Sequence, residues 1–570
     1  FLLLTRLAMM LPIGSDLAMR AHLFSAFLSA LAIMFTYLVV VRIIIKFRGA
    51  PETLADKIVT YGAAFLGTMT LAFSTTYWDN AVEAEVYGAS MFFLSTVMWL
   101  ALRWLERSEN EGSEKYILLI AYLIGLSLGV HLLALLAIFP VLMIIYFKRY
   151  AFSLASFMKF GAVAVVVFFV VYPGIVKWIP GMMDGEMGKT KSDVIKYIPW
   201  ILLAGAVYGI YDSYIKKKKV LHIALLSGVM IFFGYTTYTS VLIRANQNPP
   251  MNENDPSNLK RLTSYLGREQ YGDAPFVQRR YSNEPQHQGI YSNYKSDTDF
   301  LIRYQLNHMF FRYIGWNFIG QESDIQDYGV SWKDTWGIPF LIGMFGLWYH
   351  FSRDWKMGLI FLAMFVILGP VLALYQNQQE PQPRERDYFY VGAYFVFSVW
   401  IAIGVVGIID LIRKQLPTAT TAIAAASVLL FMGAVPANLF RVNFHDHDRR
   451  GDYVAWDYSY NILQTCEKDA ILFTNGDNDT FPLWYLQDVE AVRRDVRIVN
   501  LSLVNTNWYV QQMKQKPYYV EAKAVPMSLT DKQVQEIQPM QFETTTMSLP
   551  VPRDVYARFG VTDTAVINKG

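Results

Sequence analysis

The stretch "AHLFSAFLSALAIMFTYLVVVRIIIKF", from Ala21 to Phe47, is a long apolar run. About 20 apolar residues are enough for one helix to cross the hydrocarbon core of a bilayer. Comparable runs recur along the 570 residues, of which 54% are hydrophobic and 17% charged. The sequence therefore predicts a mostly α, polytopic transmembrane helical bundle with the lipid bilayer as its partner. A net charge of only +3 indicates no nucleic-acid partner.

The apolar runs predict twelve membrane segments. Gly125 and Gly129 predict a break in the fourth run, so the fourth and fifth segments form a shallow hairpin with His131 at its tip. The segments are Ala21–Phe47, Ile58–Thr75, Tyr87–Leu105, Tyr116–Val130, Leu132–Phe147, Phe157–Trp178, Tyr197–Ile215, Val220–Ile243, Trp336–His350, Met357–Leu374, Tyr390–Ile412 and Ala419–Ala437.

The basic residues predict the orientation, because cytoplasmic loops of membrane proteins retain Lys and Arg. Under this topology the basic residues of six connections fall on one face, which is therefore expected to be cytoplasmic. They are Lys46, Arg48 and Lys57; Arg103, Arg107 and Lys115; Lys148 and Arg149; Lys216 to Lys219; Arg353 and Lys356; and Arg413 and Lys414.

The opposite face is predicted to hold most of the polar sequence. A polar segment as long as Arg244–Asp334 is usually functional or disordered. We therefore expect functional groups on this face. It also receives Trp78–Val86, His131, Pro180–Ser192, Gln376–Tyr388 and the residues after Ala437.

The sequence after Ala437 changes character. "AILFTNG" (Ala470–Gly476) predicts a buried strand, and a helix follows that begins near Asp479, capped by Asn478 or Asp479. "DVRIVNLSL" predicts a second strand and "NTNWYVQQMK" a second helix. Strands that alternate with helices are typical of a parallel α/β unit. The chain thus divides into a transmembrane domain, residues 1–437, and a small extracytoplasmic α/β domain, residues 438–570.

Three carboxylates lie in "WDNAVEAEVYGAS", between two apolar runs. If this stretch is helical, Asp79 and Glu83 share a face, whereas Glu83 and Glu85 do so if it is extended. A carboxylate beside a bilayer is costly unless it meets water or a cation. The stretch is therefore either an interfacial loop made soluble by its charges or part of a site.

Two further polar stretches lie at the outer ends of membrane segments. "QNQQEPQPRERDYFY" carries Arg384 and Arg386, whose guanidinium groups suit a lipid-linked phosphate. The alternative is a set of internal pairs with Glu385 and Asp387. "RANQNPPMNENDPSN" combines Arg244 with amides such as Asn252, which suit a hydroxyl-rich ligand. The alternative is a common Pro/Asn turn cluster.

Histidines give weaker signals. His131, taken alone, is better interpreted as a structural histidine. "HDHD" (His445–Asp448) has the residue types of metal ligands, but a solvated junction before the C-terminal domain is the favoured interpretation. We predict no metal and no cofactor.

Six stretches together resemble a polytopic membrane-protein family abundant in Bacteroidota, which is itself similar to the vertebrate transmembrane protein O-mannosyltransferase. The resemblance extends over nearly the whole chain. The stretches are "WDNAVEAEVYGASMFF", "GLSLGVHLLALLA", "NPPMNENDPSN", "REQYGDAP", "PRERDYFYVGAY" and "TNGDNDTFPLWYLQDVE".

This resemblance implies a glycosyltransferase of the C-type fold (GT-C), which uses a polyprenyl-phosphate sugar at the outer face of the membrane. It implies that Glu85 or Glu83 is the second acidic group of the site. Donor phosphate recognition then belongs to Arg386, Arg384 and Arg244, and substrate binding to His131, Asn252 and Asp387. The first outer loop of the family, which carries the main catalytic carboxylate, is expected to precede Phe1.

The predicted function is transfer of a hexose, with mannose favoured, from a polyprenyl-phosphate to Ser or Thr of exported proteins. The expected location is the bacterial inner membrane, with the active face and the C-terminal domain in the periplasm. A transporter or flippase of lipid-linked saccharides is the alternative, and a non-catalytic envelope scaffold is the third candidate. The absence of an internal sequence repeat and the one-sided polar clusters favour the enzyme.

Overall fold

The computed structural model describes residues 1–14, 16–188, 190–267, 269, 275–416, 420–517, 521–537, 555, 558 and 560. The motif at 268–275 therefore lies almost wholly outside the described residues. The chain forms two compact units, which we describe separately. Unit 1 contains Phe1–Gln247 and Pro256–Gly451, and unit 2 contains Asn248–Asp255 and Asp452–Gly570.

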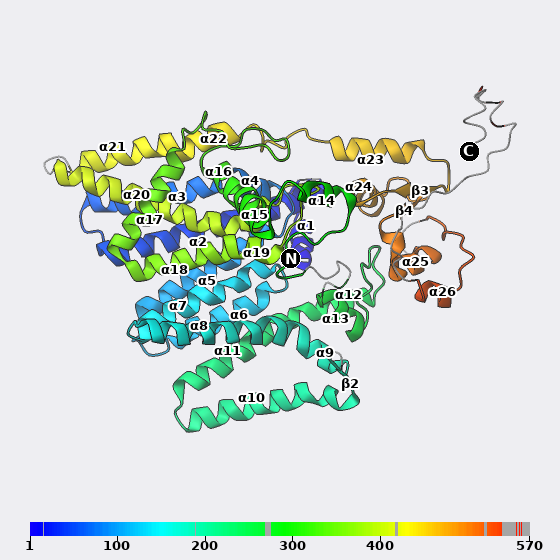
Figure 1. Ribbon diagram of the computed structural model, residues 1–570, viewed down its shortest axis with the longest axis horizontal. Helices are drawn as coiled ribbons and strands as arrows, with labels where there is room; N and C mark the ends of the chain where they lie inside the picture. The colour runs from blue at the N-terminus through cyan, green and yellow to red at the C-terminus, as the bar shows by residue number, and fades with distance from the viewer. Residues whose placement is uncertain are drawn as a thin grey trace. The chain divides into compact units, whose positions relative to one another are not determined.

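Unit 1 is built almost entirely from helices (Figure 1). Before the long polar segment they are α1 (Leu2–Met9), α2 (Leu17–Arg48), α3 (Leu54–Ala72), α4 (Thr75–Val82), α5 (Tyr87–Arg107), α6 (Glu114–Ser127), α7 (Ile138–Arg149), α8 (Leu154–Phe169), α9 (Ile179–Met183), α10 (Ile198–Ile215), α11 (Lys219–Tyr235) and α12 (Thr239–Ala245). After it they are α17 (Ile338–Arg353), α18 (Trp355–Val366), α19 (Leu372–Gln376), α20 (Val391–Gln415), α21 (Thr420–Met432) and α22 (Asn438–Asn443).

Nine helices of the described chain are long and apolar enough to cross a membrane, or ten if the bent pair α3–α4 counts as one span. These ten correspond to ten of the twelve predicted segments. The other two, Tyr116–Val130 and Trp336–His350, are correctly placed as helices α6 and α17. They have only 14 and 16 residues, short of the roughly 20 that a straight span needs. The mostly α, polytopic fold class is confirmed.

Helix α20 is the centre of unit 1. Eighteen of its residues are buried, including Tyr394, Phe397 and Trp400. A helix that is apolar on all sides lies either in a protein core or in a membrane, and α20 has the burial of a core helix. Helices α3, α17, α18 and α21 pack around α20.

Helices α10 and α11 form a hairpin at the margin of unit 1 (Figure 1). The hairpin meets the bundle where α11 packs on α6. Gly234 allows this approach, since a Cβ atom there would lie 2.5 Å from the carbonyl oxygen of Tyr122. A Cβ atom on Gly125 would overlap the carbonyl oxygen of Ile231. The two helices therefore touch backbone to backbone.

Ion pairs join the basic connections at one end of unit 1, which we call the basic end. They link residues far apart in the sequence, so the predicted sharing of one face by these connections is confirmed. The pairs include Lys46–Asp354, Arg48–Asp410, Arg413–Asp56, Lys148–Glu109 and Lys219–Glu114.

The long polar segment is folded rather than irregular. It forms α13 (Leu259–Gly267), α14 (Pro285–Tyr291), α15 (Asp297–Phe300), a π-helical stretch (Leu301–Phe311) and α16 (Arg312–Phe318). Phe300, Phe310 and Phe318 are fully buried. Its packing against the stretch Gln376–Tyr390 makes it a structural part of one end of the bundle.

Unit 2 contains α23 (Val454–Thr465), β3 (Ile471–Thr474), α24 (Asp477–Asp488), β4 (Arg497–Asn500), α25 (Asn507–Lys514) and α26 (Asp531–Gln535). Strands β3 and β4 pair in parallel, with Ile471 opposite Arg497, so the predicted parallel strand–helix–strand arrangement is confirmed. The predicted cap is wrong. The N-cap of α24 is Gly476, which makes no side-chain cap bond. Asp477 and Asp479 instead lie in the first turn, where the helix dipole favours negative charge.

Candidate functional site

The three carboxylates lie around the end of α4. Helices α3 and α4 meet at a bend of 68°, and Asp79 occupies the last turn of α4. Glu83 is the C-cap in an extended conformation, and its main-chain N–H donates to the carbonyl of Asp79. Glu85 follows outside the helix. The stretch is therefore helical up to Val82 and turns after the extended residue Glu83, where the main-chain N–H of Glu85 donates to the carbonyl of Glu83 at 2.8 Å.

Contacts with the start of α2 place this stretch at the end of the bundle opposite the basic end. The hydroxyl of Ser25 donates to the main-chain carbonyls of Asn80 and Glu85, at 3.2 and 3.3 Å. Ser25 lies near the N-terminus of α2, whereas Arg48 closes this 32-residue helix at the basic end. The carboxylates and the basic connections are therefore at opposite ends.

Two cations after α22 balance the carboxylates. Arg449 lies 3.3 Å from Asp79 and 3.6 Å from Glu83. The side chain of His447 is 2% exposed, and its Nε2 lies 3.4 Å from Asp79. Its ring stacks on Trp78 with a centroid separation of 5.0 Å. The interpretation of "HDHD" as a solvated junction is wrong for His447, because the bend at α4 covers it.

The surroundings of His447 favour its protonated form. Its Nδ1 and Nε2 lie 2.6 and 2.9 Å from the main-chain carbonyls of Asn443 and Thr75, which can only accept hydrogen bonds. In the protonated form, both ring nitrogens can donate to these carbonyls. Burial opposes this charge, but the contacts with Asp79 and the two carbonyls prevail and raise the pKa of His447.

Asp387 joins the carboxylate group from another part of the chain. The hydroxyl of Thr76 donates to its carboxylate at 2.5 Å, and the side-chain amide of Asn317 donates to that hydroxyl at 2.9 Å. Burial together with the negative charges of Asp79, Glu85 and Asp387 raises the pKa of Glu83 despite Arg449. This part of the site is rich in negative charge. The hydrogen bond from Thr76 fixes the carboxylate of Asp387 against α4.

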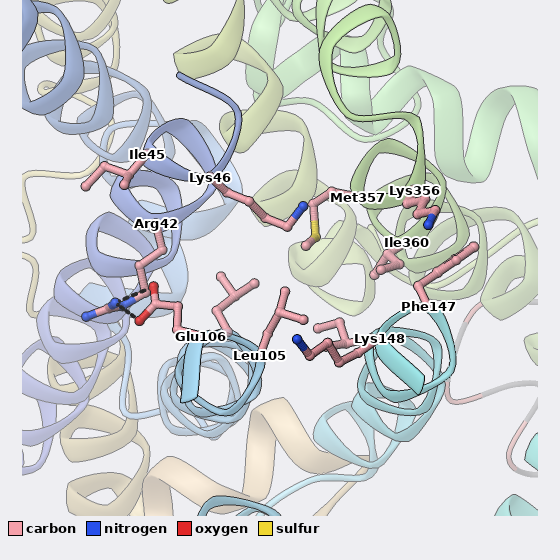
Figure 2. A pocket seen from close by; sticks show the side chains of 12 residues that line it. Arg42, Ile45, Lys46, Leu105, Glu106, Phe147, Lys148, Lys356, Met357 and Ile360 are labelled. Atoms are coloured by element: carbon pink, nitrogen blue, oxygen red, sulfur yellow. Dashed lines mark hydrogen bonds and ion pairs between the residues drawn. The ribbon is translucent and has the colours of Figure 1, made fainter. Parts of the chain in front are cut away.

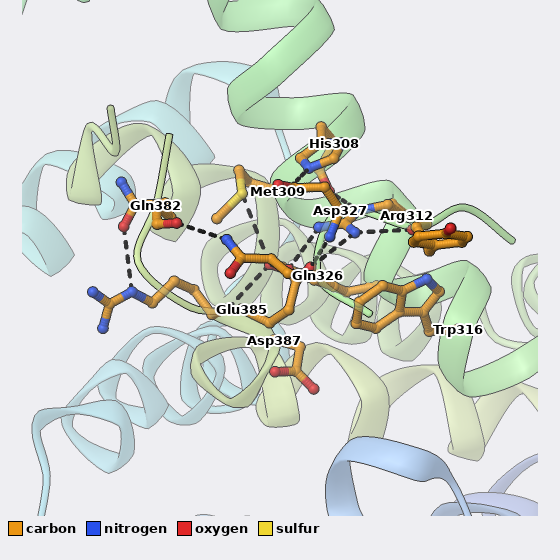
Figure 3. Close-up of polar contacts among 12 residues, drawn as sticks. His308, Met309, Arg312, Trp316, Gln326, Asp327, Gln382, Glu385 and Asp387 are labelled. Carbon is orange, nitrogen blue, oxygen red and sulfur yellow. Dashed lines mark hydrogen bonds and ion pairs between the residues drawn. The ribbon is translucent and has the colours of Figure 1, made fainter. Parts of the chain in front are cut away.

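Glu385 points into the protein and makes a tightly held ion pair. Arg312 donates to its two carboxylate oxygens at 2.7 and 3.1 Å (Figure 3). The hydroxyl of Tyr313 and the main-chain N–H of Asp327 donate to the same carboxylate at 2.5 and 2.7 Å. These donors hold the pKa of Glu385 low, although burial opposes them. The guanidinium of Arg312 also lies 4.5 Å from the ring centre of Trp316.

Arg384 and Arg386 flank Glu385 but do not pair with it. Among the residues that the structure describes, neither arginine has a carboxylate within 4.0 Å. Arg386 donates to the hydroxyl of Tyr388 at 2.8 Å and to Gln382 at 3.3 Å, and Arg384 lies 5.5 Å from the ring centre of Tyr388. The alternative interpretation of these arginines as members of internal ion pairs is therefore wrong for both.

A row of aromatic rings connects the arginines to His131. The Tyr388 and Tyr87 ring centres are 5.0 Å apart, and the Tyr87 and His131 ring centres are 5.2 Å apart. His131 lies between α6 and α7, where its Nδ1 accepts the main-chain N–H of Leu133 at 3.2 Å.

An amide-rich cavity of about 490 Å³ lies beside Arg386. Its wall includes Gln382, the residue to which Arg386 donates. Tyr281 and His287 complete it together with the amide side chains of 376–379. Such a wall offers many donors and acceptors but, among the lining residues, no charge except that of a protonated histidine.

The structure thus brings together six of the eight predicted site residues: Glu83, Glu85, His131, Arg384, Arg386 and Asp387. Arg244 is not among them, because it lies exposed at the end of α12 and donates to Gln247 at 3.1 Å. Asn252 belongs to unit 2, where its amide donates to Asp255 at 3.0 Å. Among the described residues, no three His, Cys, Asp or Glu side chains are placed to hold a metal ion.

Sequence reasoning missed several residues of this group. Asp79 was not among the predicted site residues, but it pairs with His447 and Arg449. Thr76 and Tyr388 gave no signal, because a hydroxyl in an apolar or aromatic context is common. The arginine pair after "HDHD" was the one available signal, since Arg449 and Arg450 are basic residues on a face predicted to be poor in them.

Two family models match the chain. The N-terminal domain of the protein O-mannosyl-transferase TMEM260 matches residues 1–154, and TMEM260-associated domain 2 matches residues 455–562. A curated relative is the protein O-mannosyl-transferase tmem260 of Dictyostelium discoideum, 22% identical over 148 residues. These residues are 24% of this chain and 17% of the relative.

Solved structures with some similarity include the oligosaccharyltransferase of Archaeoglobus fulgidus. Its apo form has a TM-score of 0.43 and 15% identity over 89% of this chain and 57% of that chain. The archaeal oligosaccharyltransferase AglB in complex with an inhibitory peptide and a dolichol-phosphate has a TM-score of 0.42 and 13% identity, again over 89% and 57%. This chain thus spans a little over half of those chains. In its first 154 residues and its C-terminal unit, the chain resembles the protein O-mannosyl-transferase TMEM260 family.

Proposed function

We propose that this polytopic membrane protein is a glycosyltransferase of the GT-C type. It would transfer a hexose, with mannose as the first candidate, from a polyprenyl-phosphate to a Ser or Thr hydroxyl of an exported protein. The family resemblance supports the class of reaction. The observation that carries the proposal is the position of Arg384 and Arg386, which lack a carboxylate partner in the described chain and lie beside the Glu83–Glu85 stretch at one end of the bundle.

The arginines suit the phosphate of the donor. A phosphate diester carries one negative charge, and guanidinium groups bind it in a fixed geometry. Tyr388 holds Arg386 in place through its hydroxyl, and the hydrogen bond to Gln382 leads to the amide-rich cavity. The sugar hydroxyls would occupy this cavity, where amide side chains match a ligand that is both a donor and an acceptor.

The carboxylates suit the acceptor. In the proposed step the acceptor oxygen forms a bond to C1 of the sugar while the bond from C1 to the phosphate oxygen breaks. Glu85 takes the proton of the hydroxyl, and the lipid phosphate leaves as an anion stabilised by Arg384 and Arg386. Glu83, which pairs with Arg449 at 3.6 Å, would help to position this carboxylate stretch.

The distribution of charge supports a proposal for the membrane location. The basic end of unit 1 would face the cytoplasm, because Lys and Arg are retained there. The Glu83–Arg386 end would then face the periplasm of a bacterial inner membrane, where lipid-linked donors and exported acceptors meet. At the cytoplasmic face, lipid-linked donors and exported acceptors would not meet.

The test is a transfer assay with the purified protein in liposomes. Polyprenyl-phosphate mannose and an exported protein rich in Ser and Thr are supplied, and intact-mass and peptide mass spectrometry read the product. The expected result is an added mass of one hexose on Ser or Thr. Polyprenyl-phosphate glucose serves as the sugar control. No hexose addition from either donor, under conditions where the protein is folded, would contradict the proposed function.

A further inference from the structure

A second cavity lies at the basic end, remote from the carboxylates and arginines of the proposed site. Its volume is about 540 Å³. Four candidate membrane spans border it, namely α2, α5, α7 and α18. Helices α2, α5 and α7 contribute residues of their last two turns, and α18 contributes residues of its first two turns. The cavity therefore lies where four spans reach the edge of the apolar layer, at the depth of lipid headgroups.

The wall of this cavity is amphipathic. Seven of its twelve lining residues are apolar, and four of the other five are basic: Arg42, Lys46, Lys148 and Lys356. Figure 2 shows the side chains of Lys46 and Lys148 extending into the cavity from opposite walls. Glu106 is the single acidic lining residue. The wall alone carries a net charge of +3, counted as four cations less one carboxylate.

Part of this charge is already balanced. Arg42 donates to Glu106 at 2.6 Å, Lys46 pairs with Asp354, and Lys148 lies 3.1 Å from Glu109. Among the residues that the structure describes, Lys356 has no carboxylate within 4.0 Å. Glu109 is largely exposed, with a side-chain exposure of 69%, so its pair with Lys148 is weak and can be exchanged for another anion.

We propose that this cavity binds the phosphate headgroup of an anionic phospholipid from the leaflet at the basic end. Lys148 and Lys356 contact the phosphate, and the first carbons of the acyl chains lie against apolar residues such as Phe147 and Ile360. Basic pockets between membrane helices suit such headgroups, and the apolar wall explains why the ligand has a hydrocarbon tail. A water-soluble phosphate shares the headgroup chemistry but would leave that wall in contact with water.

Native mass spectrometry of the detergent-purified protein tests this site. Three ligands are titrated separately: phosphatidylglycerol, phosphatidylcholine and glycerol phosphate. The wild type is compared with the double variant Lys148→Gln/Lys356→Gln. The control is Lys57→Gln/Lys414→Gln, which removes two lysines of the same end that do not line the cavity. Lys356 is exposed in the first turn of α18, so the single variant Lys356→Gln provides a second measurement in a protein whose core is unchanged.

The expected result is preferential binding of phosphatidylglycerol over phosphatidylcholine. Each lysine near an anionic lipid contributes about a fivefold change in affinity, so the double variant should bind phosphatidylglycerol about 25-fold more weakly, the single variant about fivefold, and the control within about twofold of the wild type. Equal binding of phosphatidylcholine, or unchanged affinity in the single variant, would overturn the proposal. Glycerol phosphate binding as tightly as phosphatidylglycerol would show a soluble phosphate site instead and would overturn the lipid assignment.

Discussion

The carboxylate of Glu385 accepts two hydrogen bonds from the guanidinium of Arg312, at 2.7 and 3.1 Å, although the two residues are 73 positions apart. This pair anchors the middle of "RERD" to the folded polar segment. Glu385 is anchored to Arg312, whereas Arg384 is exposed and Arg386 lies half-buried beside Tyr388. The ion pair with Arg312 therefore leaves Arg384 and Arg386 available for other contacts.

Removal of one partner of this pair should destabilise the protein. In the variant Arg312→Met, Glu385 keeps its charge but loses its bidentate donor in a largely buried position. Breaking a buried ion pair costs about 3–5 kcal/mol, and the partial exposure of Glu385 reduces this to about 2–4 kcal/mol. Chemical unfolding in detergent measures the change. Arg303→Met is the matched control, because its pair with Asp299 is exposed and should contribute less than about 1 kcal/mol. Equal effects of both variants would contradict the anchoring role.

Loss of Arg386 should weaken donor binding. Arg386→Ala removes a charged donor from the proposed phosphate position, so the Kd for the polyprenyl-phosphate sugar should rise roughly 10- to 100-fold. Arg384→Ala should act in the same direction but less strongly, since Arg384 is more exposed. Isothermal titration or tryptophan fluorescence gives the Kd. Arg303→Ala is the control, and donor affinity equal to that of the wild type in Arg386→Ala would show that the phosphate binds elsewhere.

Replacement of Glu85 should affect the rate rather than donor affinity. Glu85→Gln keeps the size of the side chain but cannot take a proton, so kcat should fall by roughly 10²- to 10⁴-fold while the donor Kd stays within about twofold. Glu83→Gln is measured in parallel and should have the smaller effect. Glu111→Gln, an exposed change on the loop after α5, controls for the loss of one negative charge. A wild-type kcat in Glu85→Gln would exclude it as the base.

The stability of unit 1 should depend on pH through His447. The folded pKa of His447 is raised above its ordinary value near 6.5. Its stabilising contribution is therefore complete at pH values below 6.5 and is lost as the pH rises through the raised folded pKa. We expect the Tm of the wild type to fall over this window. In Asp79→Asn the fall should be smaller and should end at a lower pH, because the folded pKa of His447 loses the contribution of Asp79, and in His447→Gln the fall should be absent. The Tm series is measured from pH 5.5 to 9 in one buffer mixture.

The orientation can be tested by cysteine labelling. In a Cys466→Ser background, single cysteines replace Glu111 and Lys217 at the basic end and Arg384 at the other end. A membrane-impermeant maleimide added outside spheroplasts should label only the cysteine at position 384. Labelling of the cysteines at positions 111 and 217 but not 384 would reverse the proposed orientation.

Helix positions could be predicted from the sequence because hydropathy reports burial in lipid directly. The run 390–412 is apolar on every side, and it proved to be the surrounded helix α20. The short lengths of α6 and α17 were also predicted closely, with 15 residues expected for each and 14 and 16 observed, because the apolar runs themselves are short. Parallel pairing of β3 and β4 was predictable from their apolar runs and the helix between them.

The site was only partly predictable. Charged residues next to membrane segments identify candidates, and their topology places them at the same end. The ion-pair partners of these residues could not be predicted, because pairing depends on three-dimensional contacts between residues that are far apart in the sequence. Nothing in the sequence around Glu385 indicates Arg312 rather than Arg384, and nothing around His447 indicates that α4 bends over it. A lone histidine such as His131 likewise gains significance only from the rings beside it.

The glycine contact between α6 and α11 should affect how fast the sequence of the α10–α11 hairpin evolves. Because main chain meets main chain at Gly125 and Gly234, the attachment of the α10–α11 hairpin does not depend on the side chains that cover its other faces. Only 6% of the apolar window of α10 and 17% of that of α11 are buried. We therefore expect substitutions among apolar residues to accumulate faster in this hairpin than in α20, with the two glycines as the slowly evolving exceptions.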